Sequence, residues 1–280
     1  MGYQMRIEHI FDYANGLKKE EKSPGTVEKY LRDVQAFFRW LCEREVDKEC
    51  TTEWKEYLQS QNYAPVTINS MLSALNSFLG YMGWEECRVK FLRVQRRMFR
   101  DQNKELNKEE YFRLLDTARA LGKERLALLI ETICSTGIRV SEVVYITVES
   151  VRSRKAQVCL KGKIRTILMP GKLCKKLLKY ARKEKIAAGE IFVTKNKKSL
   201  SRRQIWQEMK RLCSHAKVEA SKVFPHNLRH LFAVTFYRTG KDIVLLADVL
   251  GHSSIETTRL YLLSTGREHV RQLERLGLIS

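Results

Sequence analysis

The chain has 280 residues, of which 52 are Lys or Arg and 32 are Asp or Glu, so its formal net charge at pH 7 is +20. Hydrophobic residues make up 44% of the chain, enough to bury real cores, which excludes wholesale disorder. A basic surplus of this size favours a polyanionic partner over a small neutral ligand. Charge alone leaves open the alternative of a soluble basic protein without such a partner.

A membrane surface is the other polyanion to consider. The sequence has no apolar run near the roughly 20 residues that span a bilayer, and residues 1–17 hold no apolar signal core, so we expect a cytoplasmic protein. Its seven cysteines are scattered without a Cys-x-x-Cys pair, which is typical of reduced thiols. The pair Cys213 and His215 is too sparse for a zinc site, so we expect no metal and no cofactor.

The first part of the chain predicts a small helical bundle. Ser23 suits a helix N-cap and Pro24 the first helical position, so a long amphipathic helix is expected to begin there. Further helices are expected over residues 51–58 and 65–82, which makes four between residues 3 and 84. The aromatic side chains on their apolar faces are expected in the core rather than as base-stacking platforms: Phe37, Phe38, Trp40 and Phe78.

Residues 88–103 are predicted to link two domains, residues 1–87 and residues 104–280. The linker is strongly basic and has no acidic residue before Asp101. Such a run is usually a solvated linker. In a chain this basic, a segment that lies along nucleic-acid phosphates is an interpretation of at least equal weight. The predicted DNA-binding residues are Arg88, Lys90, Arg93, Arg96, Arg97 and Arg100.

The second domain is predicted to be mostly helical with one β element. Asn107 and Glu110 form a capping box that begins its first helix. Residues 155–169 place apolar residues around Lys161-Gly162-Lys163, which predicts a β-hairpin. Later helices are expected over residues 171–188, 201–217, 225–239, 242–250 and 254–263. The fold class is therefore mainly α, with a small β-hairpin (α+β).

A His-x-x-Arg pair follows Pro225, which marks a helix start. The spacing places His226 and Arg229 on one helix face, near the N-terminal turn whose N–H groups attract phosphate. Alone the pair is weak evidence, since most such pairs are surface residues.

A turn and a tyrosine follow nearer the C-terminus. Gly251 suits the left-handed end of one helix, and Ser253 with Glu256 suits the capping box of the next. His252 is thus expected in a tight turn, and Tyr261, nine residues later, about two turns along the following helix. Taken singly, such a tyrosine is usually a packing residue.

A third arginine motif, Thr136-Gly137-Ile138-Arg139-Val140-Ser141-Glu142, follows an apolar helix. Arg139 at the start of a new helix can point fixed donors at a phosphate, and Glu142 one turn later can hold the guanidinium. The alternative is a surface ion pair of little consequence.

Together these residues suit phosphoryl transfer without a metal. Two arginines can hold the non-bridging oxygens, histidines can move protons, a lysine can protonate the leaving oxygen and a tyrosine can attack. In order and spacing they resemble the tyrosine recombinases of the phage integrase family, above all its Xer-type and mobile-element members. Residues 104–280 resemble the catalytic domain and residues 1–87 the helical, SAM-like core-binding domain. The residues that carry the resemblance are Arg139, the hairpin lysine, His226, Arg229, His252 and Tyr261.

This resemblance implies a C-shaped clamp around duplex DNA and a homotetramer on a target site with inverted half-sites. Tyr261 would form a 3′-phosphotyrosine link and release a 5′-hydroxyl, with no ATP required. Arg139 and Arg229 would stabilise the pentavalent phosphate. His226 would act as the base, and His252 would hydrogen-bond a non-bridging oxygen.

The hairpin departs from the family pattern. Family members commonly have Lys-Gly-x-Lys-x-Arg, whereas this chain has Lys161-Gly162-Lys163-Ile164-Arg165, which is one residue shorter. We expect Lys161 to be the general acid because the Lys-Gly step matches best, with Lys163 as the alternate.

Several alternatives stay open. A type IB topoisomerase uses similar chemistry, and a non-catalytic DNA-binding module is a different class. Within the recombinases we favour mobile-element integration or excision, or DNA inversion, over chromosome-dimer resolution. The tail after Tyr261 is expected either to bind a neighbouring protomer in trans or to pack on its own domain; its apolar residues are Val270, Leu273, Leu276, Leu278 and Ile279.

Overall fold

The protein is described from a computed structural model, which describes residues 2–94, 104–160, 163–262 and 274–275. The chain divides into two compact units, Met1–Arg96 and Arg97–Ser280. Each unit buries its own hydrophobic core. Across these described ranges, no helix is both long and apolar enough to cross a membrane.

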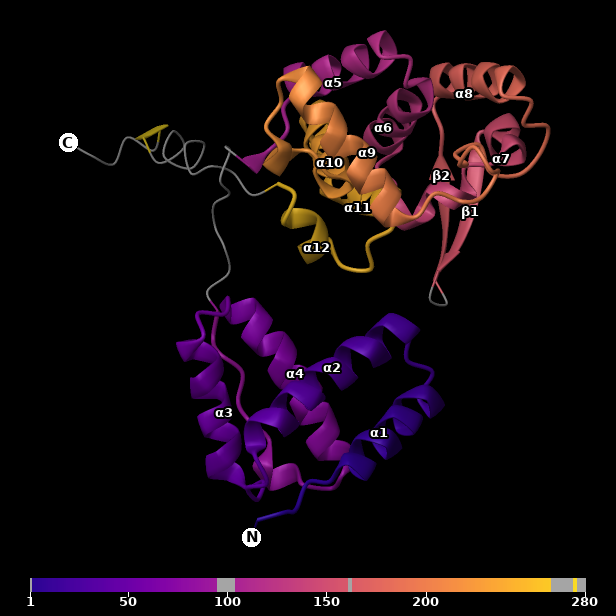
Figure 1. Cartoon of the computed structure of the whole chain (residues 1–280). Coiled ribbons are helices and arrows are strands. Elements are labelled where there is room, and N and C mark those ends of the chain that lie inside the picture. The colour runs from indigo at the N-terminus through magenta and orange to yellow at the C-terminus, as the bar shows by residue number, and fades with distance from the viewer. Residues whose placement is uncertain (1, 95–103, 161–162, 263–273, 276–280) are drawn as a thin grey trace. The chain divides into compact units, whose positions relative to one another are not determined.

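The first unit contains the four predicted helices, α1 (Ile7–Lys19), α2 (Pro24–Leu41), α3 (Lys48–Ser60) and α4 (Pro65–Tyr81), followed by a short 3-10 helix, η1 (Glu85–Cys87) (Figure 1). The Ser23 hydroxyl accepts the Thr26 N–H at 3.4 Å and caps α2, as predicted. Helix α3 begins earlier than predicted, because the Asp47 carboxylate accepts the Cys50 N–H at 2.8 Å and caps it. Phe37 and Phe78 are fully buried, whereas Phe38 and Trp40 are partly buried at the edge of the core.

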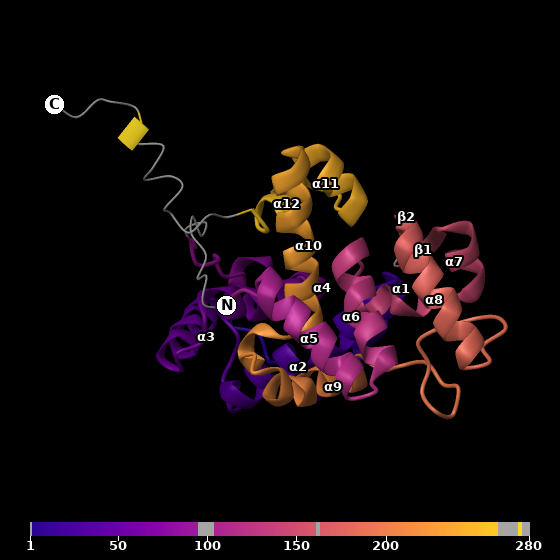
Figure 2. The ribbon, with the colours of Figure 1, turned by 90° about the horizontal axis from the view of Figure 1, so that it is seen from above.

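The second unit is helical around one hairpin. Asn107 and Glu110 form the predicted capping box, with N–H to side-chain oxygen distances of 2.7 and 3.0 Å. Helices α5, α6, α9 and α10 pack against one another, while α7 and α8 lie beside the hairpin (Figures 1 and 2). The elements are α5 (Lys108–Ala120), α6 (Glu124–Thr136), η3 (Val140–Tyr145), α7 (Val148–Ser153), α8 (Gly171–Lys183), α9 (Arg202–Ala216), η4 (Ala220–Lys222), α10 (Pro225–Gly240), α11 (Ile243–Leu250) and α12 (Ile255–Arg259).

The predicted hairpin is confirmed. Strand β1 (Lys155–Leu160) pairs antiparallel with β2 (Lys163–Leu168), with Val158 opposite Arg165 and Leu160 opposite Lys163. Side chains alternate between the two faces of the sheet, so Val158 and Ile167 are buried while Ile164 is exposed. One face of the hairpin therefore belongs to the core of the second unit.

Two helix ends differ from the prediction. Helix α8 ends at Lys183 instead of reaching residue 188, because Lys185 adopts a left-handed conformation with φ of 54°. Helix α12 is capped by Ser254, not Ser253, and ends at Arg259. The prediction that Tyr261 lies two turns along a helix is therefore wrong: its N–H bonds to the Thr258 carbonyl three residues back at 3.0 Å, which tightens the chain into a turn.

Candidate active site

Arg139 is placed by the end of α6 and held by Glu142. Helix α6 stops at Gly137, whose φ is +65° and whose Cα lies so close to the Phe232 ring that a Cβ would collide with it. Arg139 then caps η3, and the Glu142 carboxylate accepts its N–H at 2.7 Å and its Nη1 at 3.0 Å. Glu142 is only 1% exposed, so this ion pair lies half inside the protein instead of on its surface.

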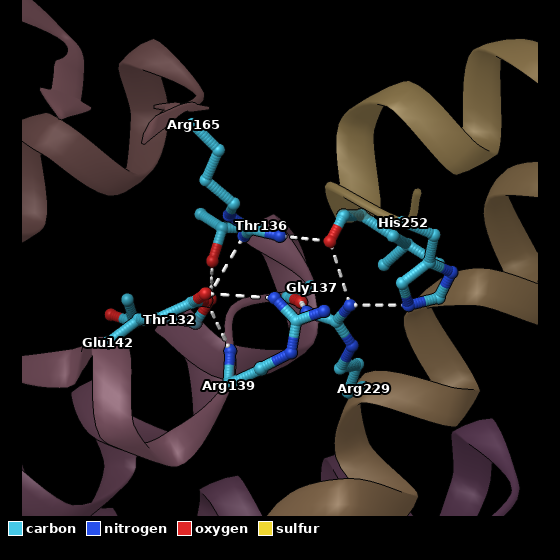
Figure 3. A network of polar contacts seen from close by, with 9 residues as sticks. Thr132, Thr136, Gly137, Arg139, Glu142, Arg165, Arg229 and His252 are labelled. Carbon is cyan, nitrogen blue, oxygen red and sulfur yellow. Dashed lines mark hydrogen bonds and ion pairs between the residues drawn. The ribbon is translucent and has the colours of Figure 1, made fainter. Parts of the chain in front are cut away.

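Arg229 projects inward from the first turns of α10. The helix begins at Pro225, which leaves His226 exposed at its N-terminus and turns Arg229 into the interior, where it is 2% exposed. The guanidinium donates to the Gly137 carbonyl and, at 2.8 Å, to the Leu250 carbonyl (Figure 3). Arg229 thus joins the ends of α6 and α11, and it also donates from Nη2 to His252 Nε2 at 2.9 Å.

His252 is neutral in this arrangement. Arginine is always a donor, so Nε2 of His252 accepts from Arg229, and Nδ1 carries the proton that it donates to Thr258 Oγ1 at 2.8 Å. Burial, followed by the charges of Arg229 and Arg139, lowers the pKa of His252 to about 4. At neutral pH the side chain is therefore an uncharged imidazole with one defined tautomer.

Tyr261 lies within a group of three histidine rings. Its ring centroid is 5.4 Å from that of His226, 5.6 Å from that of His230 and 5.7 Å from that of His252. The side chain is 7% exposed. Burial and the charge of Arg139 lower the pKa of Arg229, whereas Tyr261 acts on that pKa in the opposite direction. The tyrosine therefore lies near Arg229 of its own chain.

Two residues at this site were missed from the sequence. Arg165, on β2, lies 3.1 Å from Glu142 Oε2 through Nη2 and donates from Nη1 to the Leu250 carbonyl (Figure 3). His230 is buried, stacks on Tyr261, and places Nε2 3.1 Å from Glu105. His230 falls one turn after His226, and Arg165 shares a strand face with Ile167, but neither pattern alone indicates a function.

The arginines make the pocket strongly positive. Arg139, Arg165 and Arg229 all act on the pKa of His252, and Glu142 is the acidic residue that contacts this group among the residues described. A phosphate can supply the missing negative charge. Within the described ranges, no group of three or more His, Cys, Asp or Glu could hold a metal ion.

The other predicted site residues lie on the first unit, lie outside the described residues, or, for Lys163, have no described side chain. Lys161 lies outside the described residues, and Lys163 begins β2 but its side chain is not described. Arg88, Lys90 and Arg93 are exposed near the end of the first unit, where Arg88 pairs with Glu85 at 2.7 Å. Outside the described residues also lie the remaining predicted positions: Arg96, Arg97, Arg100 and the apolar residues of the tail.

Known proteins match the chain along most of its length. Sequence models match the phage integrase family over residues 104–267 and the phage integrase N-terminal SAM-like domain over residues 10–86. Tyrosine recombinase XerA of Pyrococcus furiosus is 28% identical over 284 residues, covering 98% of this chain and 96% of the relative. Tyrosine recombinase XerD of Vibrio cholerae is 26% identical over 274 residues, covering 89% and 88%.

Solved structures match the fold as well. The XerH site-specific recombinase bound to palindromic difH substrate, in a post-cleavage complex, superposes with a TM-score of 0.71 at 18% identity, covering 93% of this chain and 83% of that one. A lambda integrase tetramer bound to a Holliday junction gives 0.73 at 16% identity, covering 92% and 77%. The family match and these relatives define an enzyme that cleaves and rejoins DNA strands. The chain belongs to the phage integrase family, the tyrosine recombinases, and acts in site-specific recombination.

Proposed function

We propose that Tyr261 attacks the scissile phosphate of duplex DNA. Its hydroxyl oxygen forms a bond to phosphorus, the bond to the 5′ oxygen breaks, and the products are a 3′-phosphotyrosine and a 5′-hydroxyl. The observation that carries the proposal is the place of the Tyr261 ring, against three histidines and facing the buried Arg229 of the same chain. Cleavage is therefore proposed to occur in cis, within one protomer.

Each neighbour has a proposed role. Arg139 and Arg229 stabilise the charge of the pentavalent phosphate, and Glu142 keeps Arg139 in place. His226, exposed beside the Tyr261 ring, takes the tyrosine proton. His252 binds a non-bridging oxygen once DNA is present, because a phosphate that accepts the Arg229 donors frees Nε2 to hold a proton.

We propose Lys161 as the acid that protonates the leaving 5′ oxygen, with Lys163 as the alternate. An alkoxide leaves slowly without a proton, and a lysine beside the phosphate can supply one. In support, the hairpin that carries both residues is fixed to the active site through Arg165. A substrate with sulfur at the bridging 5′ position releases a thiolate, which needs no proton donor. This substrate should therefore restore cleavage by the Lys161→Ala variant.

DNA binding is proposed to use both units and the basic linker, residues 88–103, between residues 1–87 and 104–280. The net charge of +20 and the exposed Arg88, Lys90 and Arg93 support it. Arg96, Arg97 and Arg100 are proposed to contact phosphates in the same way. By analogy with the tetramer of lambda integrase on a Holliday junction, we propose a homotetramer on a site with inverted half-sites.

The C-terminal tail is proposed to bind a neighbouring protomer. A mostly apolar groove of about 670 Å³ lies among α5, α6, α10 and α11, and its wall includes Phe112, which is 56% exposed, with Phe232, Phe236 and Leu245. The apolar residues of the tail, from Val270 to Ile279, suit this groove in chemistry. Ending the chain near Ser264 should leave monomer binding intact and abolish cooperative loading of two half-sites. Unchanged cooperativity would mean that the tail packs on its own domain.

The biological reaction is proposed to be element integration or excision, or DNA inversion. Chromosome-dimer resolution is the second candidate, which the similarity to recombinases named XerA and XerD favours. The inverted repeats and genes that flank the coding sequence decide between them.

The chemistry is tested with a nicked duplex that traps the covalent product. Wild-type protein should give a species that survives SDS and disappears with protease, and the DNA-bearing peptide should contain Tyr261. A new strand with a free 5′-hydroxyl should then be joined to the trapped end. A DNA-bearing peptide from another part of the chain would contradict the assignment.

A further inference from the structure

Arg165 shares a hydrogen-bond or ion-pair acceptor with each of the two arginines of the proposed mechanism. Its Nη1 donates to the Leu250 carbonyl, which also accepts Nη2 of Arg229 at 2.8 Å. Its Nη2 is 3.1 Å from Glu142 Oε2, on the carboxylate that also holds Arg139 (Figure 3). The approach is close: a Cβ on Gly251 would lie 2.5 Å from Arg165 Cδ. Arg165 is thus built into the same network as the phosphate pocket.

Packing alone does not account for an arginine at this place. The Arg165 side chain is 12% exposed, and its Nε and Nη2 make no hydrogen bond within the described part of the protein, so that the Glu142 contact is an ion pair only. Burial and the charges of Arg229 and Arg139 lower the pKa of Arg165 to about 10, although the Glu142 carboxylate opposes the shift. An apolar side chain of similar size would fill the space without burying a charge.

Arg165 also marks the point where the hairpin leaves the core. It pairs with the buried Val158, and beyond this pair Cys159 and Ile164 are both exposed, Ile164 by 76%. Beyond Arg165, the Tyr145 hydroxyl donates to the Cys159 carbonyl at 3.0 Å. Arg165, whose side chain is 12% exposed, therefore lies where β2 passes from the core to its exposed end.

We propose that Arg165 is a positioning residue for strand cleavage. Through Glu142 and the Leu250 carbonyl it fixes the base of the hairpin to the phosphate pocket, so that the proposed lysine donor reaches the leaving 5′ oxygen. A two-stranded antiparallel ladder transmits this constraint over the two remaining residue pairs. The inference rests on the proposed function, in which Lys161 or its alternate Lys163 supplies the proton.

The test compares cleavage rates on two nicked duplexes, with oxygen or sulfur at the bridging 5′ position, at saturating protein. Arg165→Ala should cleave the oxygen substrate about 100-fold slower than wild type, the low end of what a lost proton donor costs, and the sulfur substrate at a near wild-type rate. Arg165→Lys should behave in the same way, because an ammonium on a flexible stem lacks the fixed fork of the guanidinium. Arg152→Ala, which removes an exposed arginine of the neighbouring α7, is the matched control and should cleave both normally.

Two results would overturn the proposal. Equal slowing of Arg165→Lys on both substrates would mean that Arg165 supports the phosphate pocket itself. Normal rates for Arg165→Ala on both substrates would mean that Arg165 has no part in cleavage. Rescue on sulfur also shows that the pocket is folded, and Arg165→Lys decides the matter if the alanine variant does not fold. The variants Lys161→Ala and Lys163→Ala distinguish a failure of the proposed proton donor from a failure of the role proposed for Arg165. If sulfur rescues neither lysine variant, the proposed proton donor fails and this inference with it; if it rescues a lysine variant but not Arg165→Lys, only this inference fails.

Discussion

Replacing Glu142 by Gln removes the carboxylate that pairs with Arg139 and Arg165 inside the second unit. Removing one partner of a buried ion pair costs about 3–5 kcal/mol, because the other charge stays buried. The side chain of Arg139 is 42% exposed and Gln keeps one carbonyl acceptor, so the loss belongs at the low end, about 3 kcal/mol. At about 2–4 °C per kcal/mol for a domain of this size, the melting temperature should fall by about 6–12 °C.

The assay is thermal unfolding of the full chain by circular dichroism at pH 7 and low salt. Glu149→Gln is the matched control, since Glu149 is exposed and its carboxylate accepts the Gly189 N–H at 3.1 and 3.2 Å. It should change the melting temperature by a small fraction of the Glu142 effect. Sulfate should stabilise Glu142→Gln more than wild type, because a dianion can replace the lost carboxylate. Equal melting temperatures for the two variants would refute the reasoning.

Three further outcomes are expected. If about six phosphates are neutralised, the logarithm of the DNA-binding constant should fall against the logarithm of salt concentration with a slope of about −5. The double variant Arg96→Ala with Arg97→Ala should weaken binding to all sequences alike. Filter binding across salt concentrations measures both effects. Arg139→Ala should slow adduct formation about 100- to 1,000-fold with a modest loss of stability, measured on a nicked duplex, because it leaves charge on the phosphate unpaired. The pKa of His252 is about 4 in the folded protein and 6.5 ordinarily, so the unfolded chain takes up the proton first as the pH falls. The contribution of neutral His252 to stability is therefore present above pH 6.5 and should be lost as the pH falls to 4. After solvent screening, this contribution is about 2 kcal/mol. Urea unfolding at pH 7 and pH 4.5 measures it: the loss of stability between the two pH values should be smaller for His252→Gln than for wild type.

Local rules were enough to predict much of the fold. Ser23 and Asn107 act as helix caps within three or four residues of chain, and the alternation around Lys161-Gly162-Lys163 is the direct signature of a hairpin. The failure at Tyr261 has an equally local cause that periodicity does not reveal. The chain after α12 tightens to a bond between residues 258 and 261, and Thr258 is buried under it as the partner of His252.

Arg165 and His230 could not be singled out from the sequence because their surroundings come from distant segments. Arg165 reaches Leu250 across 85 residues, and His230 meets Glu105 from the start of the second unit. In the sequence, Arg165 only completes the hairpin pattern that resembles the family's, without a role of its own, and His230 is a histidine beside an arginine. Only tertiary packing shows that both contact the group around Tyr261, Arg229 and Glu142.

The place of Tyr261 makes one measurement the most direct. Tyr261→Phe removes a single hydroxyl and keeps the ring that stacks on His230 and His252, so fold and DNA binding should be preserved. On a nicked suicide duplex, wild type should accumulate a covalent species that resists SDS, whereas Tyr261→Phe should bind the same DNA with equal affinity and form none. A covalent adduct formed by Tyr261→Phe would contradict the account, because the attacking oxygen would then belong to another residue.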